Sequence, residues 1–395
     1  MSGALGRLVG LVGTAVLATV CVAAAPAVAV PEPENRTVAG QLGELRRLYR
    51  EAEAATEAYN AAEEELAGQR AEVRRLDREL AAARLSLRDS RGAAGRLARQ
   101  QYQSRTDLSP YLGLLLTRDP RRALDQSHVI RRVSVDRAGT VARLAGSERR
   151  TGVLARKARR ALDAQLSLAE RHRERRDDVR ERLRKVEELL ASLGDEQLDR
   201  IAALERDETA GAQERFLASG ALGGAPGSSR PPSGGGAAAL RYAVAQIGKP
   251  YEWGAEGPAA YDCSGLTSRA WARAGRTVPR TSQEQWARLP RVPMDRLRPG
   301  DLVVYFPEAT HVAVYLGGGL VVQAPRPGAR VKVSPIAANP VLGAVRPDPD
   351  GEPLARYTPP ELPEEALDGP DEGYASAAAP VTGGKTLPRR PRMTG

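Results

Sequence analysis

A seven-residue repeat of apolar side chains is the strongest constraint on how this chain folds. Residues 38–216 are rich in Ala, Arg, Glu and Leu and contain few Pro or Gly residues, a composition typical of long helices. One position of the repeat is held by Leu45, Ala52, Tyr59, Leu66, Val73, Leu80 and Leu87, and the position three residues later by Leu48, Ala55, Ala62, Gln69, Leu76 and Ala83. A second seam comprises Val179, Leu183, Val186, Leu190 and Leu193. This spacing predicts a coiled coil.

The period breaks between the two seams. Pro110, Gly113 and Pro120 interrupt it there, and four leucines crowd into positions 112–116. Since Pro and Gly end helical patterns, we expect an antiparallel helical hairpin over residues 38–216. The leucine cluster is either a hairpin tip that buries itself or a docking surface for another protein. The seams leave the oligomeric state open.

The N-terminal segment has the pattern of a secretory signal. Arg7 precedes an apolar run, and small residues at Ala27 and Ala29 predict cleavage after residue 29. An uncleaved membrane anchor over residues 8–25 is the alternative. Cleavage would remove Cys21, one of two cysteines, and leave Cys263 as a free thiol in a secreted protein, either extracellular or associated with the cell wall.

The remaining chain divides by composition. Residues 217–239 predict a Gly/Ser/Pro linker, residues 240–345 a small domain holding all three tryptophans, and residues 346–395 a disordered tail. In the domain we expect helices over 240–247, 263–274 and near 282–287, then strands starting at 301, 311, 319 and 331. The fold class is therefore α+β with an antiparallel sheet, preceded by the helical hairpin.

The net charge of +10 does not indicate nucleic acid. Basic residues alternate with acidic ones along the helical segments, which is typical of a solvated helix surface, and export removes the usual nucleic-acid target. A weak attraction to anionic wall polymers or membranes is a further hypothesis.

Cys263 and His311 are the candidate catalytic pair. Cys263 begins a predicted helix, where free backbone N–H groups favour a thiolate, and His311 is the only histidine in the domain. The glycine-rich turn at 316–320 should bring Gln323 opposite His311 or one position away, so Gln323 could orient the imidazole. One Cys and one His are too few for a closed zinc site, and we expect no metal.

These residues stand in segments that resemble the NlpC-type (NlpC/P60) cell-wall cysteine peptidases: "IGKPYEWGAEG", "YDCSGL", "VPRTSQEQ", "RPGDLVVYF" and "HVAVYLGGG". The resemblance implies a papain-like fold with Cys263 as nucleophile, His311 as general base and Gln323 as the third polar residue. Many members have histidine at that third position, so Gln323 is a departure that could orient the ring but not share its charge.

The same resemblance implies a set of substrate-binding residues. Tyr251 matches a tyrosine beside the thiolate, and Asp262 and Ser264 match positions that help to hold the stem peptide. Arg280 and Gln285 fall in a matching segment whose role is either substrate binding or structural.

The implied reaction is hydrolysis of peptidoglycan stem peptides between D-glutamate and the following diamino acid, with no metal or cofactor. The helical half resembles rods that precede such domains in bacterial division hydrolases, which implies restraint of the enzyme until a membrane-embedded division partner binds. Two alternatives stay open. One is a structural or adaptor protein with an inactive domain, and the other is an acyltransferase or amidase that uses the same dyad.

Overall fold

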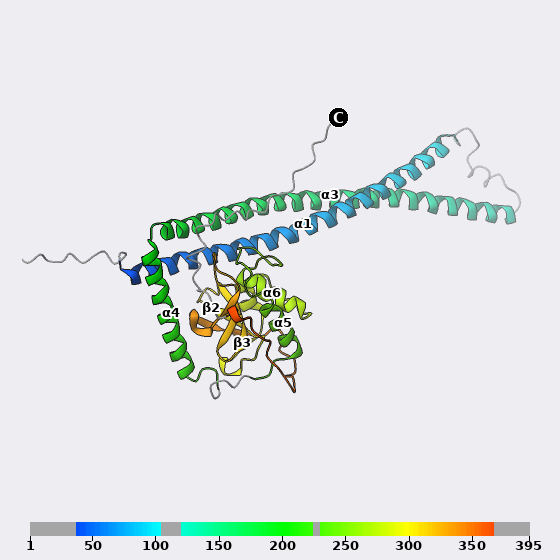
Figure 1. Cartoon of the computed structure of the whole chain (residues 1–395). Helices are drawn as coiled ribbons and strands as arrows, with labels where there is room; N and C mark the ends of the chain where they lie inside the picture. The colour runs from blue at the N-terminus through cyan, green and yellow to red at the C-terminus, as the bar shows by residue number, and fades with distance from the viewer. Residues whose placement is uncertain (1–36, 104–119, 224–229, 367–395) are drawn as a thin grey trace, which may run out of the picture.

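The computed structural model describes residues 37–103, 120–223 and 230–366. They form a long helical hairpin and an α+β domain that lies in the angle between the hairpin and a third helix (Figure 1). The predicted fold class is confirmed. The predicted signal segment and the leucine cluster at 112–116 lie outside the described residues. No described helix is both long and apolar enough to cross a bilayer.

Helices α1 (Val38–Gln103) and α3 (Pro120–Ala191) form the hairpin, which we call the rod. They lie side by side over most of their length and diverge toward the hairpin end (Figure 1). Buried residues from the two predicted seams include Leu45, Ala52, Leu66, Leu80, Val179, Leu183, Val186 and Leu190. Burial of these side chains stabilises the pair, although the alanines contribute little apolar area.

A third helix, α4 (Asp195–Ala218), was not predicted as a separate element. The chain turns at residues 192–194, and α4 starts with acidic residues in its first turn, where they complement the positive end of the helix dipole. Ile201 of α4 packs with Leu42 and Leu45 of α1 and Val186 of α3 in a small apolar core. This core fixes α4 against the base of the rod.

The α+β domain contains a six-stranded antiparallel sheet in the order β1-β6-β2-β3-β4-β5. Its strands are β1 (Arg291–Val292), β2 (Leu302–Tyr305), β3 (His311–Gly317), β4 (Leu320–Gln323), β5 (Lys332–Pro335) and β6 (Val341–Val345). Its helices are α5 (Gly234–Val244), α6 (Cys263–Arg273) and α7 (Ser282–Arg288), and 3-10 turns lie at Met294–Arg296, Ile336–Ala338 and Glu364–Ala366. Strands β1 and β6 escaped prediction because one is very short and the other carries Gly343.

The domain extends beyond the predicted limits at both ends. Helix α5 starts at Gly234, inside the expected linker, because the Ser233 side chain accepts a hydrogen bond from the Gly236 amide and caps the helix. Residues 346–366 pack on the domain instead of forming a free tail. Asp348 pairs with buried Arg298 at 3.0 Å, and Ala366 is fully buried. Polar composition hid these contacts, because the few apolar residues of the segment, such as Ala366, have no regular spacing.

Candidate active site

Cys263 is the first residue of α6, as predicted. The Asp262 side chain caps the helix by accepting a hydrogen bond from the Gly265 amide at 2.6 Å. A side chain at residue 265 would collide with the Ala255 carbonyl oxygen, which lies 2.2 Å from the point where its Cβ atom would stand, so the turn requires glycine. The helix N-terminus therefore presents its positive dipole end to the Cys263 sulfur.

His311 and Gln323 form a hydrogen-bonded pair at the start of β3 and the end of β4. His311 Nε2 lies 2.7 Å from Gln323 Oε1, and both side chains are buried. Val314 pairs with Val322, so the continued register places Gln323 diagonally from His311, not opposite or one position away. A long side chain reaches such a diagonal neighbour. The backbone amide of Val312, the residue after His311, donates a hydrogen bond to the Cys263 sulfur, so Cys263 lies beside the start of β3.

The predicted binding residues gather around the N-terminus of α6. Arg280 donates to Asp262 Oδ2 at 2.7 Å and to Ser264 Oγ at 2.9 Å. Tyr251 is buried in the same core cluster as Cys263, and burial, with the nearby thiol, raises its pKa. Gln285 donates to the Pro279 and Ser264 carbonyls and accepts from Thr267, so it joins α6 to α7.

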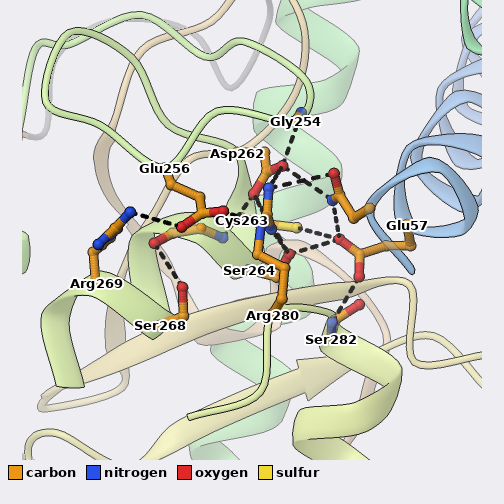
Figure 2. Close-up of polar contacts among 12 residues, drawn as sticks. Glu57, Gly254, Glu256, Asp262, Cys263, Ser264, Ser268, Arg269, Arg280 and Ser282 are labelled. Carbon is orange, nitrogen blue, oxygen red and sulfur yellow. Dashed lines mark hydrogen bonds and ion pairs between the residues drawn. The ribbon is translucent and has the colours of Figure 1, made fainter. Parts of the chain in front are cut away.

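The most consequential residues of the site come from α1 and were not predicted. Glu57 accepts hydrogen bonds from Ser264 Oγ and from the Ser282 amide, both at 2.7 Å, and lies 3.9 Å from Cys263 Sγ (Figure 2). One turn further along α1, Asn60 donates to Asp262 at 3.1 Å. The face of α1 thus lies directly over the N-terminus of α6.

Glu53 contacts the other half of the dyad. Its Oε1 lies 3.6 Å from His311 Nδ1, the nitrogen not bound to Gln323. Glu53 and Glu57 are four residues apart and so share one helix face. One carboxylate therefore meets the imidazole and the other the thiol.

Burial changes the protonation of this cluster. It raises the pKa of Glu53 to about 8 and that of Glu57 to about 7, with repulsion between Glu57 and Asp262 adding to the second shift. The pKa of Cys263 is raised well above its usual value, first by burial and then by Glu57, Asp262 and Glu53. In this form of the chain the thiolate is disfavoured, and the thiol is only 2 % exposed.

The rod and α4 hold the domain at further points. Tyr59 of α1 meets the Trp253 ring edge-on at 5.0 Å between centroids. Glu205 of α4 pairs with buried Arg326 at 3.0 Å. Gln213 of α4 donates to the Gly319 carbonyl at 2.8 Å. The contact is therefore spread along two helices and both ends of β4.

Sequence reasoning missed Glu53, Glu57 and Asn60 for a physical reason. They occupy one face of α1 beside the seam positions Ala52 and Tyr59, and acidic residues at such positions are normally solvated. The only trace of their role is their spacing of four and three residues along one helical face. That spacing indicates a contact with the site only once the position of the domain against α1 is known.

The fold and site define an α+β domain in which a cysteine stands at a helix N-terminus and a His–Gln pair lies on the neighbouring strands. Residues 248–343 match the model of the NlpC/P60 family, and we assign this domain to that family.

Curated relatives share only part of the chain. A probable endopeptidase of Corynebacterium glutamicum is 47% identical over 94 residues, covering 24% of this chain and 45% of the relative. A probable endopeptidase of Mycobacterium tuberculosis is 36% identical over 129 residues, covering 31% and 34%. The match thus spans less than half of either relative. The crystal structure of the NlpC/p60 domain of peptidoglycan hydrolase SagA is 33% identical, covering 28% of this chain and 97% of that one, with a TM-score of 0.27.

Proposed function

We propose that this chain is a secreted peptidoglycan endopeptidase that cleaves stem peptides between D-glutamate and the diamino acid, and that α1 holds it inactive. The family of the domain and the names of its relatives support peptidase activity on the wall. The observation that carries the proposal is the Cys263, His311 and Gln323 arrangement with two α1 carboxylates placed against it.

The proposed chemistry follows from the groups present. Once α1 has moved away, His311 takes the proton of the Cys263 thiol, and the resulting thiolate attacks the amide carbonyl while backbone N–H groups at the start of α6 stabilise the oxyanion. His311 then donates a proton to the leaving amine and later takes one from the water that cleaves the acyl-enzyme. Gln323 keeps the ring oriented through its 2.7 Å hydrogen bond.

The proposed restraint follows from the α1 side chains that already occupy the site. Glu57 already takes the Ser264 hydroxyl and the Ser282 amide, and Glu53 faces His311 Nδ1. A substrate carbonyl therefore cannot reach Cys263 until α1 moves away. We call the observed arrangement the closed form.

We also propose that a partner of the rod, such as a membrane-embedded division protein, releases α1. Side chains exposed on the N-terminal half of α3 support this proposal: Leu124, Val129, Val133, Val135 and Val141. A partner that binds them would hold the rod at a distance from the domain.

The products of wall digestion test the reaction. In the Glu53→Arg/Glu57→Arg double variant, the new positive charges would face Arg326 and Arg280 and open the closed form. This opened variant is incubated with purified wall fragments, and the masses of the products are measured by mass spectrometry. Products ending in D-glutamate support the endopeptidase. Products with a new amide or ester would indicate an acyltransferase, a cut elsewhere an amidase, and intact fragments an adaptor with an inactive domain.

The two partners of Cys263 should differ in importance. In the opened variant, His311→Ala should slow turnover by about 100-fold or more because proton transfer is lost. Gln323→Ala should slow it by about 10-fold, since the imidazole stays present but loses its orientation. Steady-state rates on one stem peptide measure both, and equal losses would mean that Gln323 does more than orient the ring.

Restraint should weaken as pH rises. The closed form holds protons on Glu53 and Glu57, whose pKa values there are about 8 and about 7, whereas free glutamates titrate near 4.5. The two protonated carboxyl groups therefore contribute fully to the stability of the closed form below pH 4.5. This contribution is lost as the pH rises toward 8. The hydrolysis rate of the wild-type chain, divided by that of the opened variant, should increase from pH 5 to pH 8. A flat ratio would show that these protons do not stabilise closure.

A further inference from the structure

A cavity beside the dyad remains open in the closed form. It has a volume of about 970 Å³ and lies between α1, α4 and the loop that follows β4. Gln323 and Glu53, which each lie against one nitrogen of the His311 ring, form part of its wall. The cavity is therefore adjacent to the imidazole, while Glu57 and Asn60 fill the space beside Cys263 and Asp262.

The imidazole side of the dyad is the side of the leaving group. His311 must protonate the departing nitrogen, so that nitrogen and the residue attached to it lie next to the ring. The cavity accordingly corresponds to the half of the substrate groove that would receive the diamino acid side of the scissile bond.

Arg326, three residues after Gln323, is a largely buried cation in the wall of this cavity. Its side chain is 9 % exposed, and its guanidinium donates to both oxygens of Glu205, at 3.0 and 3.4 Å. The Tyr49 ring lies 4.6 Å away. Tyr49 belongs to α1 and Glu205 to α4, so both contacts join Arg326 to helices outside the domain.

We infer that Arg326 is the carboxylate-binding residue on the leaving-group side of the substrate groove, and that Glu205 occupies its place in the closed form. The planar fork of a guanidinium fits a carboxylate, and in the closed form that of Arg326 holds both oxygens of Glu205. The part of the stem peptide on that side of the bond ends in a free C-terminal carboxylate, and a diamino acid with a second carboxyl group would add another. A substrate carboxylate would replace that of Glu205 once the helices have moved.

The two ends of the site are then blocked in the same way, each by a glutamate of a helix outside the domain. On one side of the dyad a carboxylate of α1, Glu57, occupies the Ser264 and Ser282 donors near Arg280. On the other side a carboxylate of α4 occupies Arg326. The closed form thus places carboxyl side chains where the carboxylates of a peptide would bind, and Arg326 contributes to the selection of that peptide.

The test rests on the proposed function and uses the stem peptide cleaved by the full-length opened variant. This peptide is synthesised with its carboxylates on the leaving side either free or amidated. In the opened background, Arg326→Gln should lower kcat/KM about 10- to 100-fold for the free carboxylate, as expected for a lost charge-assisted hydrogen bond. The amidated peptide should be cleaved at an unchanged rate, and Arg326→Lys should restore part of the loss.

The control is Arg330→Gln, which removes the same charge from an exposed side chain bonded to the Gly248 carbonyl. It should affect neither peptide. If Arg326→Gln slows both peptides equally, or neither, the inference is wrong while the endopeptidase stands. Failure of the opened variant itself to cleave any stem peptide would instead contradict the proposed function.

Discussion

Replacing Glu53 and Glu57 together by arginine should raise the rate of wall hydrolysis by the full chain about 100-fold. In the closed form the new cations would be buried, one near Arg326 and the other near Arg280, whose guanidinium is tied to Asp262 and Ser264. A buried charge without a partner costs about 3 kcal/mol or more, which corresponds to about 100-fold in the fraction of open molecules.

The matched control carries the same change of charge on the same helix. Glu64 and Glu65 of α1 are exposed, so Glu64→Arg/Glu65→Arg should leave the rate at the wild-type level. Release of dyed peptidoglycan fragments measures all three chains. An equal rise in both double variants would assign the effect to net charge and remove the specific role of Glu53 and Glu57.

Cys263→Ala should abolish hydrolysis by the opened variant, with a loss of at least about 1,000-fold, because no other group can form the acyl-enzyme. The change removes only a sulfur atom from a buried position, so the fold should persist. Mass spectrometry of a timed digest measures the loss, and circular dichroism checks the fold.

Residual turnover in this variant has a clear meaning. A folded Cys263→Ala chain that still cleaves stem peptides at a substantial rate would show that another nucleophile, or directly activated water, performs the reaction. Cys263→Ser is the closer replacement and should also be inactive, since a hydroxyl beside His311 is a far weaker nucleophile than a thiol.

The candidate dyad could be predicted from sequence because its chemistry leaves local marks. Cys263 stands at a helix start after the capping residue Asp262, and His311 stands at the start of a strand. The prediction that Gln323 contacts the His311 ring required only a tight turn, although the register differed from the expectation. Helix starts, strand starts and tight turns depend on residues that are close in sequence, so the local sequence pattern predicts them.

The elements that cover the site could not be predicted in the same way. Glu57 meets Ser264 across 207 positions of the chain, and no periodicity encodes so distant a contact. Helix α4 was hidden because the break at residues 192–194 is short and its flanks keep a helical composition. The packed segment at residues 346–366 was hidden because ion pairs such as Arg298–Asp348 have no sequence period.

The central claim is that α1 closes the site, and the alkylation rate of the Cys263 thiol tests it most directly. Iodoacetamide is added at pH 7 to the mature full-length chain, to Glu53→Arg/Glu57→Arg and to Glu64→Arg/Glu65→Arg, and modified Cys263 is followed by mass spectrometry. A buried thiol with a raised pKa reacts slowly. The account predicts slow modification of the wild-type and control chains and modification about 100-fold faster in the opened variant. Equally fast reaction in all three chains would contradict it.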